Sequence, residues 1–374
     1  MFIALRELKF ARARFGLMGA VVALIAVLMV MLSGLSVGLV NDGVSGLQRL
    51  PVTSFAFEEG VQHDAAFSRS VVKADAVAAW KRQKGVQEAA PFGNALVNAK
   101  SDSGVEIDFA LFGVEAGSFL SPAVAQGARL SDQDPTGIVV SRTAVEDGIK
   151  LGDTVTVDRI GTRLKVVGTL ADQHTYGHVD VAYVPLRTWQ EVRVGAGPGD
   201  EVPARAHEEI TAVAVKGANA DTAAGDKAAG TETLTLEEAF GASPGYTAET
   251  STLTLIKVFL YAISALVVGA FFTVLTIQRK QEIAVVRAMG ASTGYLLGDA
   301  IAQALILLLL SVGVGVAVGV GLGGLIGGTA PFALEVGPVA SASVLLIVLG
   351  VVGALAAVLR ITSVDPLTAL GGSR

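Results

Sequence analysis

The residues of this chain that could do chemistry are few, and they do not form a catalytic set. The sequence holds no cysteine and four histidines, which are His63, His174, His178 and His207. His174 and His178 are four positions apart in DQHTYGHVD, but this turn-prone stretch lacks the H-E-x-x-H pattern of a zinc helix and predicts a surface loop. No G-x-S-x-G nucleophile turn occurs. We therefore expect no enzyme activity, no catalytic residues and no metal site of the chain's own.

The sequence also lacks the phosphate-binding pattern G-x-x-x-x-G-K-[ST], so we expect no nucleotide hydrolysis by this chain. Any ATP and Mg would be bound by a separate ATPase subunit. The segment RKQEIAVVRAMGAS, residues 279–292, interrupts two apolar runs with three cations and a glutamate, and it suits docking of such a partner. Its spacing predicts a short helix, a turn at Gly290, and a second short helix capped by Ser292 or Thr293.

The elements that must position these residues are membrane helices. The chain has 374 residues, 52% of them hydrophobic, and a mean hydropathy of +0.59, which is typical of a membrane protein. Crossing a bilayer takes about 20 apolar residues. Four runs without Asp, Glu, Lys, Arg or His are long enough, namely Phe15–Val40, Val258–Gln278, Ala300–Leu334 and Val336–Leu359. The first run exceeds a signal-peptide core, so we expect it to be a retained anchor.

The charges predict how these helices are oriented. The segment before the first run, residues 279–292 and the tail after the last run are all basic, which places both termini in the cytoplasm of a multi-pass protein of the cell membrane. Residues 41–250 carry a net charge of −11 and the rest of the chain +5. The acidic insert is therefore expected outside the cell, and we expect contact with membrane lipid and no nucleic acid.

These observations predict an α-helical membrane protein with four transmembrane helices and an α+β extracytoplasmic domain inserted between helices 1 and 2. The predicted parts are a cytoplasmic amphipathic helix at 1–14, transmembrane helices at 15–40, 251–278, 300–326 and 338–360, the inserted domain at 41–250, a cytoplasmic coupling segment at 279–299, an extracellular hairpin at 327–337 and a cytoplasmic tail at 361–374.

Within the insert, four local patterns are readable. Apolar spacing predicts a helix over 68–86. The SDSG turn at 101–104 predicts a hairpin between two strands, and 142–149 predicts a short helix. The Gly/Ala/Asp-rich stretch 217–230 predicts a mobile loop.

Glycines recur every four residues in the third span, at Gly315, Gly319, Gly323 and Gly327, and the first span has Gly34 and Gly38. This spacing puts them on one helix face and lets a neighbouring backbone approach closely. The simplest interpretation is helix packing within one subunit. The alternative is a face that slides against another helix during a transport cycle.

The segment after the second span resembles a motif of the FtsX/MacB-like permeases of ABC transporters, R-x-x-E-[IL]-[AG]-x-x-R-A-x-G-A. Its positions are held here by Arg279, Glu282, Ile283, Ala284, Arg287, Ala288, Gly290 and Ala291. Four spans with a large insert after the first support the resemblance, which covers nearly the whole chain. The tail departs from the family pattern, since Thr368 stands where an acidic residue is usual.

The resemblance implies a permease homodimer that works with two copies of an ABC ATPase. Arg279, Glu282, Arg287, Met289 and Gly290 would couple to that ATPase. Closure of the ATPase would move the spans and, through them, the external domains, a mode of action called mechanotransmission. The chain would have no intrinsic cofactor.

The chain is most similar to the small haem-exporting permeases of Gram-positive bacteria, of the HrtB type, which implies haem as the transported substrate. Haem is flat and hydrophobic, its iron takes donors such as His or Met, and its propionates favour cations. Met29 lies in the outer half of the first span, and Arg49, Phe57, Glu58, Glu59 and His63 follow it. We expect Arg49 to meet a propionate, Phe57 to stack, and Met29, Glu58, Glu59 or His63 to meet the iron.

Two other functions stay open for a chain of this family. An FtsX-like permease would transmit ATPase motion to a cell-wall hydrolase without moving a substrate, and it should present an exposed apolar patch to that partner. The remaining possibility is efflux of another amphiphile or of an antimicrobial peptide.

Overall fold

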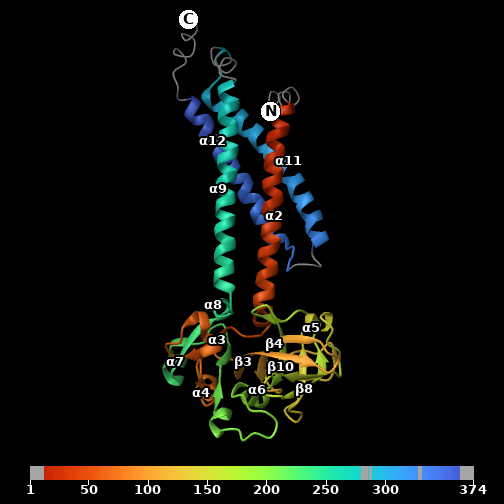
Figure 1. Cartoon of the computed structure of the whole chain (residues 1–374). Coiled ribbons are helices and arrows are strands. Elements are labelled where there is room, and N and C mark those ends of the chain that lie inside the picture. The colour runs from red at the N-terminus through yellow and green to blue at the C-terminus, as the bar shows by residue number, and fades with distance from the viewer. Residues whose placement is uncertain (1–11, 279–284, 286–288, 327–330, 363–374) are drawn as a thin grey trace. The chain divides into compact units, whose positions relative to one another are not determined.

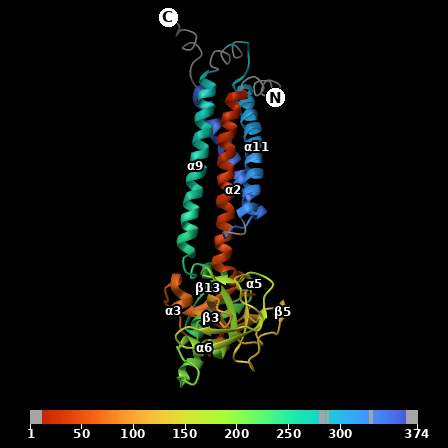
Figure 2. The same ribbon diagram turned by 45° about the vertical axis from the view of Figure 1, so that its right-hand side comes forward.

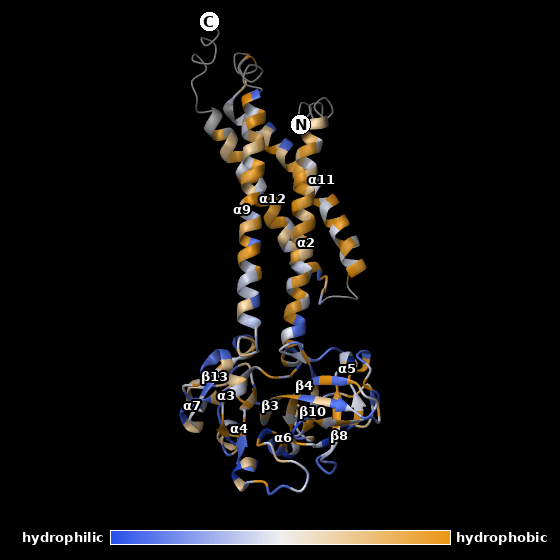
Figure 3. Ribbon diagram, in the orientation of Figure 1, coloured by the Kyte–Doolittle hydropathy of each residue, from blue (hydrophilic) through white to orange (hydrophobic). Residues whose placement is uncertain are grey.

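The computed structural model describes residues 12–278, 285, 289–326 and 331–362, and it divides into two compact units (Figure 1). The membrane unit comprises Met1–Leu39 and Thr250–Arg374, and the inserted domain comprises Val40–Glu249. Figure 3 shows apolar residues along the long helices and polar residues over the surface of the inserted domain. The structure thus has the predicted class, with four helices that could span a membrane and an α+β domain between the first two.

The four long helices are α2 (Arg12–Gln48), α9 (Tyr246–Gln278), α11 (Thr293–Ile326) and α12 (Val336–Thr362). Helix α2 continues eight residues past Val40, where the uncharged run ends, because the polar residues from Asn41 onward bond to the inserted domain. Ser292 accepts a hydrogen bond from the Tyr295 amide at 3.2 Å, as expected of a cap. The prediction of a second short helix is wrong, because the capped helix is α11 itself, which begins at Thr293.

The membrane unit is held by close helix contacts, and Figures 1 and 2 show its long helices from two directions. An ideal Cβ at Gly315 of α11 would lie 2.5 Å from the Ala23 carbonyl oxygen of α2. Gly269 of α9 and Gly353 of α12 also pack closely, since an ideal Cβ at Gly269 would lie 3.3 Å from the Gly353 carbonyl oxygen. The sequence pattern did not predict this second contact. These glycines let backbones approach where a larger residue would hold them apart.

The inserted domain has two lobes that share one strand, β3 (Glu88–Ser101). In the first lobe the strand order is β13 (Thr231–Thr235), β1 (Ser54–Glu58), β12 (Ala212–Lys216) and the start of β3. Helices α3 (Ala66–Arg69), α4 (Ala76–Lys81), α7 (Thr222–Ala229) and α8 (Leu236–Phe240), the 3-10 turn η1 (His63–Ala65) and the small sheet of β2 (Val72–Lys73) with β11 (Glu209–Ile210) complete this lobe.

The second lobe is a ring of six strands closed by hydrogen bonds. The order is β3, β4 (Glu106–Val114), β10 (Val179–Pro185), β6 (Gly137–Val140), β8 (Arg163–Thr169), β7 (Thr154–Val157) and back to β3. Strands β5 (Gln126–Gly127) and β9 (Thr175–Tyr176) pair at its margin, and α5 (Arg142–Glu146), α6 (Leu186–Arg193) and η2 (Ala204–Glu208) connect strands. Because the ring has no free edge between its six strands, it holds a compact apolar core.

Strand β3 passes between the lobes at a glycine pair. Gly93 of β3 lies opposite Gly113 of β4, and the fully buried ring of Trp189 from α6 packs over both. The indole takes the space that two side chains would otherwise fill, which fixes α6 against the sheet. Rings of both lobes then pack edge to face, from Phe55 and Phe67 through Phe92 and Phe112.

Two local predictions for the insert are wrong, and a third, a short helix, is confirmed with an earlier end. The helix expected over 68–86 is split into α3 and α4 by strand β2, because the extended residue Val72 pairs with Ile210. The loop expected at 217–230 contains helix α7, started by the Asp221 side chain, which accepts a hydrogen bond from the Ala224 amide. The helix expected over 142–149 ends at Glu146. The hairpin at 101–104 is confirmed by the register of β3 with β4.

Candidate functional site: a stalk joint in the inserted domain

The clearest polar site of the chain lies where α2 ends inside the inserted domain. The last turns of α2, residues 41–48, and Arg49 after them pack against residues 173–178, which carry β9 and the turn into β10. We call these two segments, with Ser243 and Glu249, the stalk joint. The joint belongs wholly to the inserted domain, and α2 and α9 run from it into the membrane unit.

Hydrogen bonds fasten the two segments of the joint at several successive residues. The hydroxyl groups of Ser45 and Thr175 lie 2.8 Å apart, and the Thr175 amide donates to the Ser45 oxygen at 3.0 Å. The Gly177 amide and the Ser243 hydroxyl both donate to the Gly43 carbonyl, at 2.8 and 2.9 Å. Ser45 and Thr175 are buried, so water could not replace these hydrogen bonds. Breaking them would leave polar groups unsatisfied and would cost free energy.

Glycine lets the helix lie this close. An ideal Cβ at Gly46 would be 2.8 Å from the Val181 side chain and 3.0 Å from the Thr175 carbonyl oxygen. The end of α2 therefore rests on the sheet as part of the domain's packing, and a displacement of this helix end acts directly on β9 and β10.

His178 ties α2 and α9 together at the joint. Its Nδ1 lies 2.8 Å from Asp42 Oδ2, and its Nε2 lies 3.1 Å from Glu249 Oε1. Burial acts to lower the pKa of His178, but the hydrogen bond that the ring donates to Asp42 and the negative charge of Glu249 outweigh it, and the pKa is raised. His178 also has a positive φ of 66°, which orients the side chain out of the turn toward both carboxylates.

A cavity of about 490 Å³, which we call the joint cavity, opens beside this site. It is lined by residues 49–51, 119–123 and 170–172 together with His174 and Tyr183. His174 Nδ1 lies 3.0 Å from the buried Tyr183 hydroxyl. Burial, helped by the positive charge of Arg49, lowers the pKa of His174 to about 4, so its imidazole is neutral at physiological pH.

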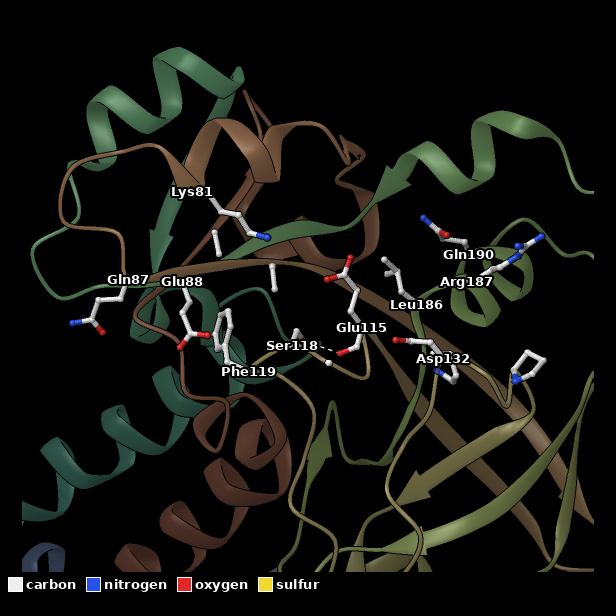
Figure 4. Close-up of a pocket in the computed structure, with 15 residues that line it drawn as sticks. Lys81, Gln87, Glu88, Glu115, Ser118, Phe119, Asp132, Leu186, Arg187 and Gln190 are labelled. Atoms are coloured by element: carbon white, nitrogen blue, oxygen red, sulfur yellow. Dashed lines mark hydrogen bonds between the residues drawn. The ribbon is translucent and has the colours of Figure 1, made fainter.

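A larger cavity of about 900 Å³ lies where the two lobes meet (Figure 4). Its wall mixes both signs of charge, with Lys81, Glu88, Glu115, Asp132 and Arg187. In Figure 4, Lys81 extends into the opening from the end of α4, and Glu115 from the loop that follows β4. No group of three possible metal-binding side chains occurs among the residues that the structure describes. The mixed charges select no single class of ligand.

Each residue predicted to receive haem contacts a different set of neighbours in the structure. Met29 is 2% exposed and belongs to the membrane core, and Phe57 is fully buried in the core of the inserted domain. Phe57 therefore has no free face for stacking, because β1 is covered on both sides. Arg49 Nη1 pairs with Asp172 at 3.2 Å and lines the joint cavity.

The other predicted haem ligands follow β1. The Glu58 carboxylate accepts a hydrogen bond from the Val71 amide at 3.2 Å, and Glu59 is exposed. His63 Nε2 lies 2.8 Å from Glu232 Oε1. No contact found in the described residues joins Arg49 to these three side chains.

The predicted coupling residues fall mostly outside the description. Arg279, Glu282 and Arg287 lie outside the described residues. Met289 is 75% exposed, and Gly290 has a φ of +96°, a conformation that favours glycine.

The predicted packing glycines all face crowded surroundings, except Gly327, which lies outside the described residues. An ideal Cβ at Gly319 would be 2.8 Å from Val30 of α2, and one at Gly323 would be 2.5 Å from the Phe332 ring. Gly34 lies against the same ring, and Gly38 against the Pro331 carbonyl. These contacts are made within one chain.

The sequence pattern missed the stalk joint. DQHTYGHVD was expected to be a surface loop, yet Thr175 and Tyr176 are buried and both histidines are engaged. The available signals were the polar residues after the first uncharged run and the i,i+4 histidines, but nothing in their spacing links position 42 to position 178.

Comparison with known proteins places this geometry in a family. Residues 15–228 match the MacB-like periplasmic core domain, and residues 254–366 match the FtsX-like permease C-terminal region. The chain is 24% identical to a protein of Staphylococcus haemolyticus described as hemin transport system permease protein HrtB, over 100% of this chain and 99% of that one. An uncharacterized ABC transporter permease of Mycobacterium tuberculosis is also 24% identical, with the same coverage. The periplasmic region of MacB from Actinobacillus actinomycetemcomitans aligns with 50% of this chain and 91% of its own length, at 16% identity and a TM-score of 0.36.

Proposed function

Because the chain belongs to the FtsX/MacB-like family of ABC transporter permeases, we propose that it is the membrane subunit of a pump that exports haem by mechanotransmission. A separate ATPase, present in two copies, would bind ATP and Mg, and two copies of this chain would form the permease. Both termini would lie in the cytoplasm and the inserted domain outside. The ATPase would engage the 279–299 segment.

The stalk joint is the observation that carries the mechanical part of the proposal. Helix α2 runs without a break from Arg12 to Gln48, and in its last turns Asn41 and Ser45 both bond to Thr175 of β9. Helix α9 enters the same joint through Glu249. A helix fixed at one end by buried hydrogen bonds transmits displacement instead of absorbing it in a flexible linker.

Haem as the substrate is supported by the full-length likeness to permeases described as hemin transport proteins. The lateral site proposed from the sequence would use Met29 with Glu58, Glu59 or His63. Its test is a titration of the purified chain with ferric haem. Replacement Met29→Ala should weaken the binding or change the absorption spectrum, and an unchanged titration of this variant and of the Glu58, Glu59 and His63 variants would remove that site.

Coupling to the ATPase has its own test. The chain has no cysteine, so a single Met289→Cys replacement gives one labelling site on an exposed side chain. Impermeant reagent should label it only from the cytoplasmic side. Glu282→Arg should weaken copurification of the ATPase, and labelling from outside the cell would reverse the proposed topology.

The FtsX-like alternative finds little support in the inserted domain. Its exposed large apolar side chains are Val71, Leu96, Val145, Leu151 and Val194. These five side chains are few for a domain of this size, whereas docking of a hydrolase calls for a contiguous apolar patch. Haem export therefore remains the function that we propose.

A further inference from the structure

The joint cavity combines an apolar wall with a metal-binding nitrogen and a cation. The accessible apolar side chains that line it are Pro51, Phe119 and Pro122, and Leu120 and Leu170 lie buried beneath them. A volume of about 490 Å³ is within the range of about 300–1,000 Å³ of small-molecule sites. Such a wall suits a ligand with a large flat apolar surface.

His174 is prepared to bind a metal through one nitrogen. Its Nδ1 is engaged by the Tyr183 hydroxyl at 3.0 Å, and the two rings meet at 73°. Nε2 has no hydrogen-bond partner among the described residues. A partner on one imidazole nitrogen orients the ring so that the other can bind a metal.

A single donor decides which kind of metal can bind. Bare Zn²⁺ takes about four protein ligands in a structural site, and no group of three candidate ligands occurs among the described residues. One imidazole is, however, a complete axial ligand for iron that a porphyrin already holds by four nitrogens. The cavity thus favours a metal inside a planar chelate over a free ion.

Arg49 supplies the charge for the polar edge of such a ligand. Its guanidinium pairs with Asp172 at 3.2 Å, and the two side chains are 43% and 59% exposed. An exposed ion pair contributes little to stability, so a ligand carboxylate can replace Asp172 at small cost. Arginine then binds that carboxylate through two parallel hydrogen bonds.

We propose that the joint cavity is a haem-binding site of the inserted domain, with His174 as the axial iron ligand and Arg49 as the partner of a propionate. This inference rests on the proposed haem export, and it adds a second site to the lateral one near Met29. When Nε2 binds iron, Nδ1 carries the hydrogen and donates it to the Tyr183 oxygen. No covalent step is involved.

The test is a titration of the full-length purified chain with three porphyrins. Ferric haem probes all contacts, metal-free protoporphyrin IX probes the cavity without the iron, and the dimethyl ester of the metal-free porphyrin probes it without carboxylates. His174→Ala should weaken ferric haem at least about 10-fold and shift its Soret band, while metal-free protoporphyrin still binds. Arg49→Gln should weaken the binding of ferric haem and of metal-free protoporphyrin IX, which both carry propionates. It should leave the binding of the dimethyl ester unchanged.

Two further variants separate this site from the lateral one. Ala123→Phe fills the mouth of the cavity and should reduce binding of all three porphyrins, even if His174→Ala were to fold poorly. His207 lines neither of the two proposed sites, so His207→Ala is the matched histidine control and should leave the His174-dependent Soret shift in place. Trp80 and Trp189 both lie in the inserted domain, so tryptophan fluorescence checks its folding in every variant.

The outcomes distinguish the two proposals. If ferric haem binds His174→Ala and Ala123→Phe as it binds the wild type, the joint cavity is not a haem site, while haem export through another site stands. If the wild-type chain binds no haem under any condition, both proposals are overturned. If His174→Ala weakens the binding of ferric haem and shifts its Soret band but leaves the binding of metal-free protoporphyrin IX unchanged, the assignment is supported.

Discussion

The bridge that His178 makes between α2 and α9 gives a prediction whose sign depends on pH. The protonated ring faces Asp42 of α2 at 2.8 Å and Glu249 of α9 at 3.1 Å. The negative charge of Asp42 also acts on Asp180, whose pKa is raised. Since the pKa of His178 is raised in the folded state, its charge stabilises the fold fully below about pH 6.5. That contribution is lost as pH rises through the folded pKa.

The magnitude follows from the exposure of the three side chains, which is 31% for His178, 27% for Asp42 and 38% for Glu249. A partly exposed ion pair contributes about 0.5 kcal/mol, so the bridge contributes about 1 kcal/mol. In a domain of this size about 1 kcal/mol shifts the melting temperature by about 2–4 °C. His178→Asn should therefore lower the melting temperature by this amount at pH 6 and by much less at pH 9.

The assay is thermal unfolding of the full chain in detergent, followed by tryptophan fluorescence, because both tryptophans report on the inserted domain. Asparagine tolerates the positive φ of position 178, so the replacement removes the charge without new backbone strain. Arg159→Asn is the matched control, because Arg159 also has a positive φ, of 67°, and is exposed. An equal deficit for His178→Asn at pH 6 and pH 9 would refute the ionic bridge, as would the same deficit in the control.

The remaining predictions concern packing, ligation and a buried acid. Gly315→Ala should destabilise the membrane unit by about 1–3 kcal/mol, because the added Cβ would meet Ala23. Gly313 faces open space, so Gly313→Ala should be neutral or stabilising. Unfolding of both variants in detergent checks this. Haem ligation by His174 should persist in absorption spectra down to about pH 5, because its pKa is about 4; loss of the spectrum near pH 6.5 would contradict this. Burial raises the pKa of Asp180 to about 6, so stability should fall as pH rises from about 4 to 6, and Asp180→Asn should flatten this part of the melting profile.

The sequence by itself determined the class of the protein, its spans and its family. Long runs without charge have no stable place except a membrane or a large core, so Phe15–Val40 and its three counterparts were readable from composition. The R-x-x-E motif at Arg279 and the hairpin at 101–104 are local patterns, and local patterns need no knowledge of distant contacts. The family follows from the same motif, and the comparisons confirm it.

Only the tertiary structure decided what the polar residues do. The stalk joint brings Asp42, His178 and Glu249 together across more than a hundred residues of chain, and no spacing rule predicts such a contact. The fate of Phe57 was decided in the same way, because its ring packs edge to face against Phe67 of α3 in the core of the inserted domain. Val72 is extended, despite its helical spacing, because it pairs with Ile210. In each case a long-range contact outweighed a local preference, since burial and strand pairing contribute more free energy than intrinsic propensity does.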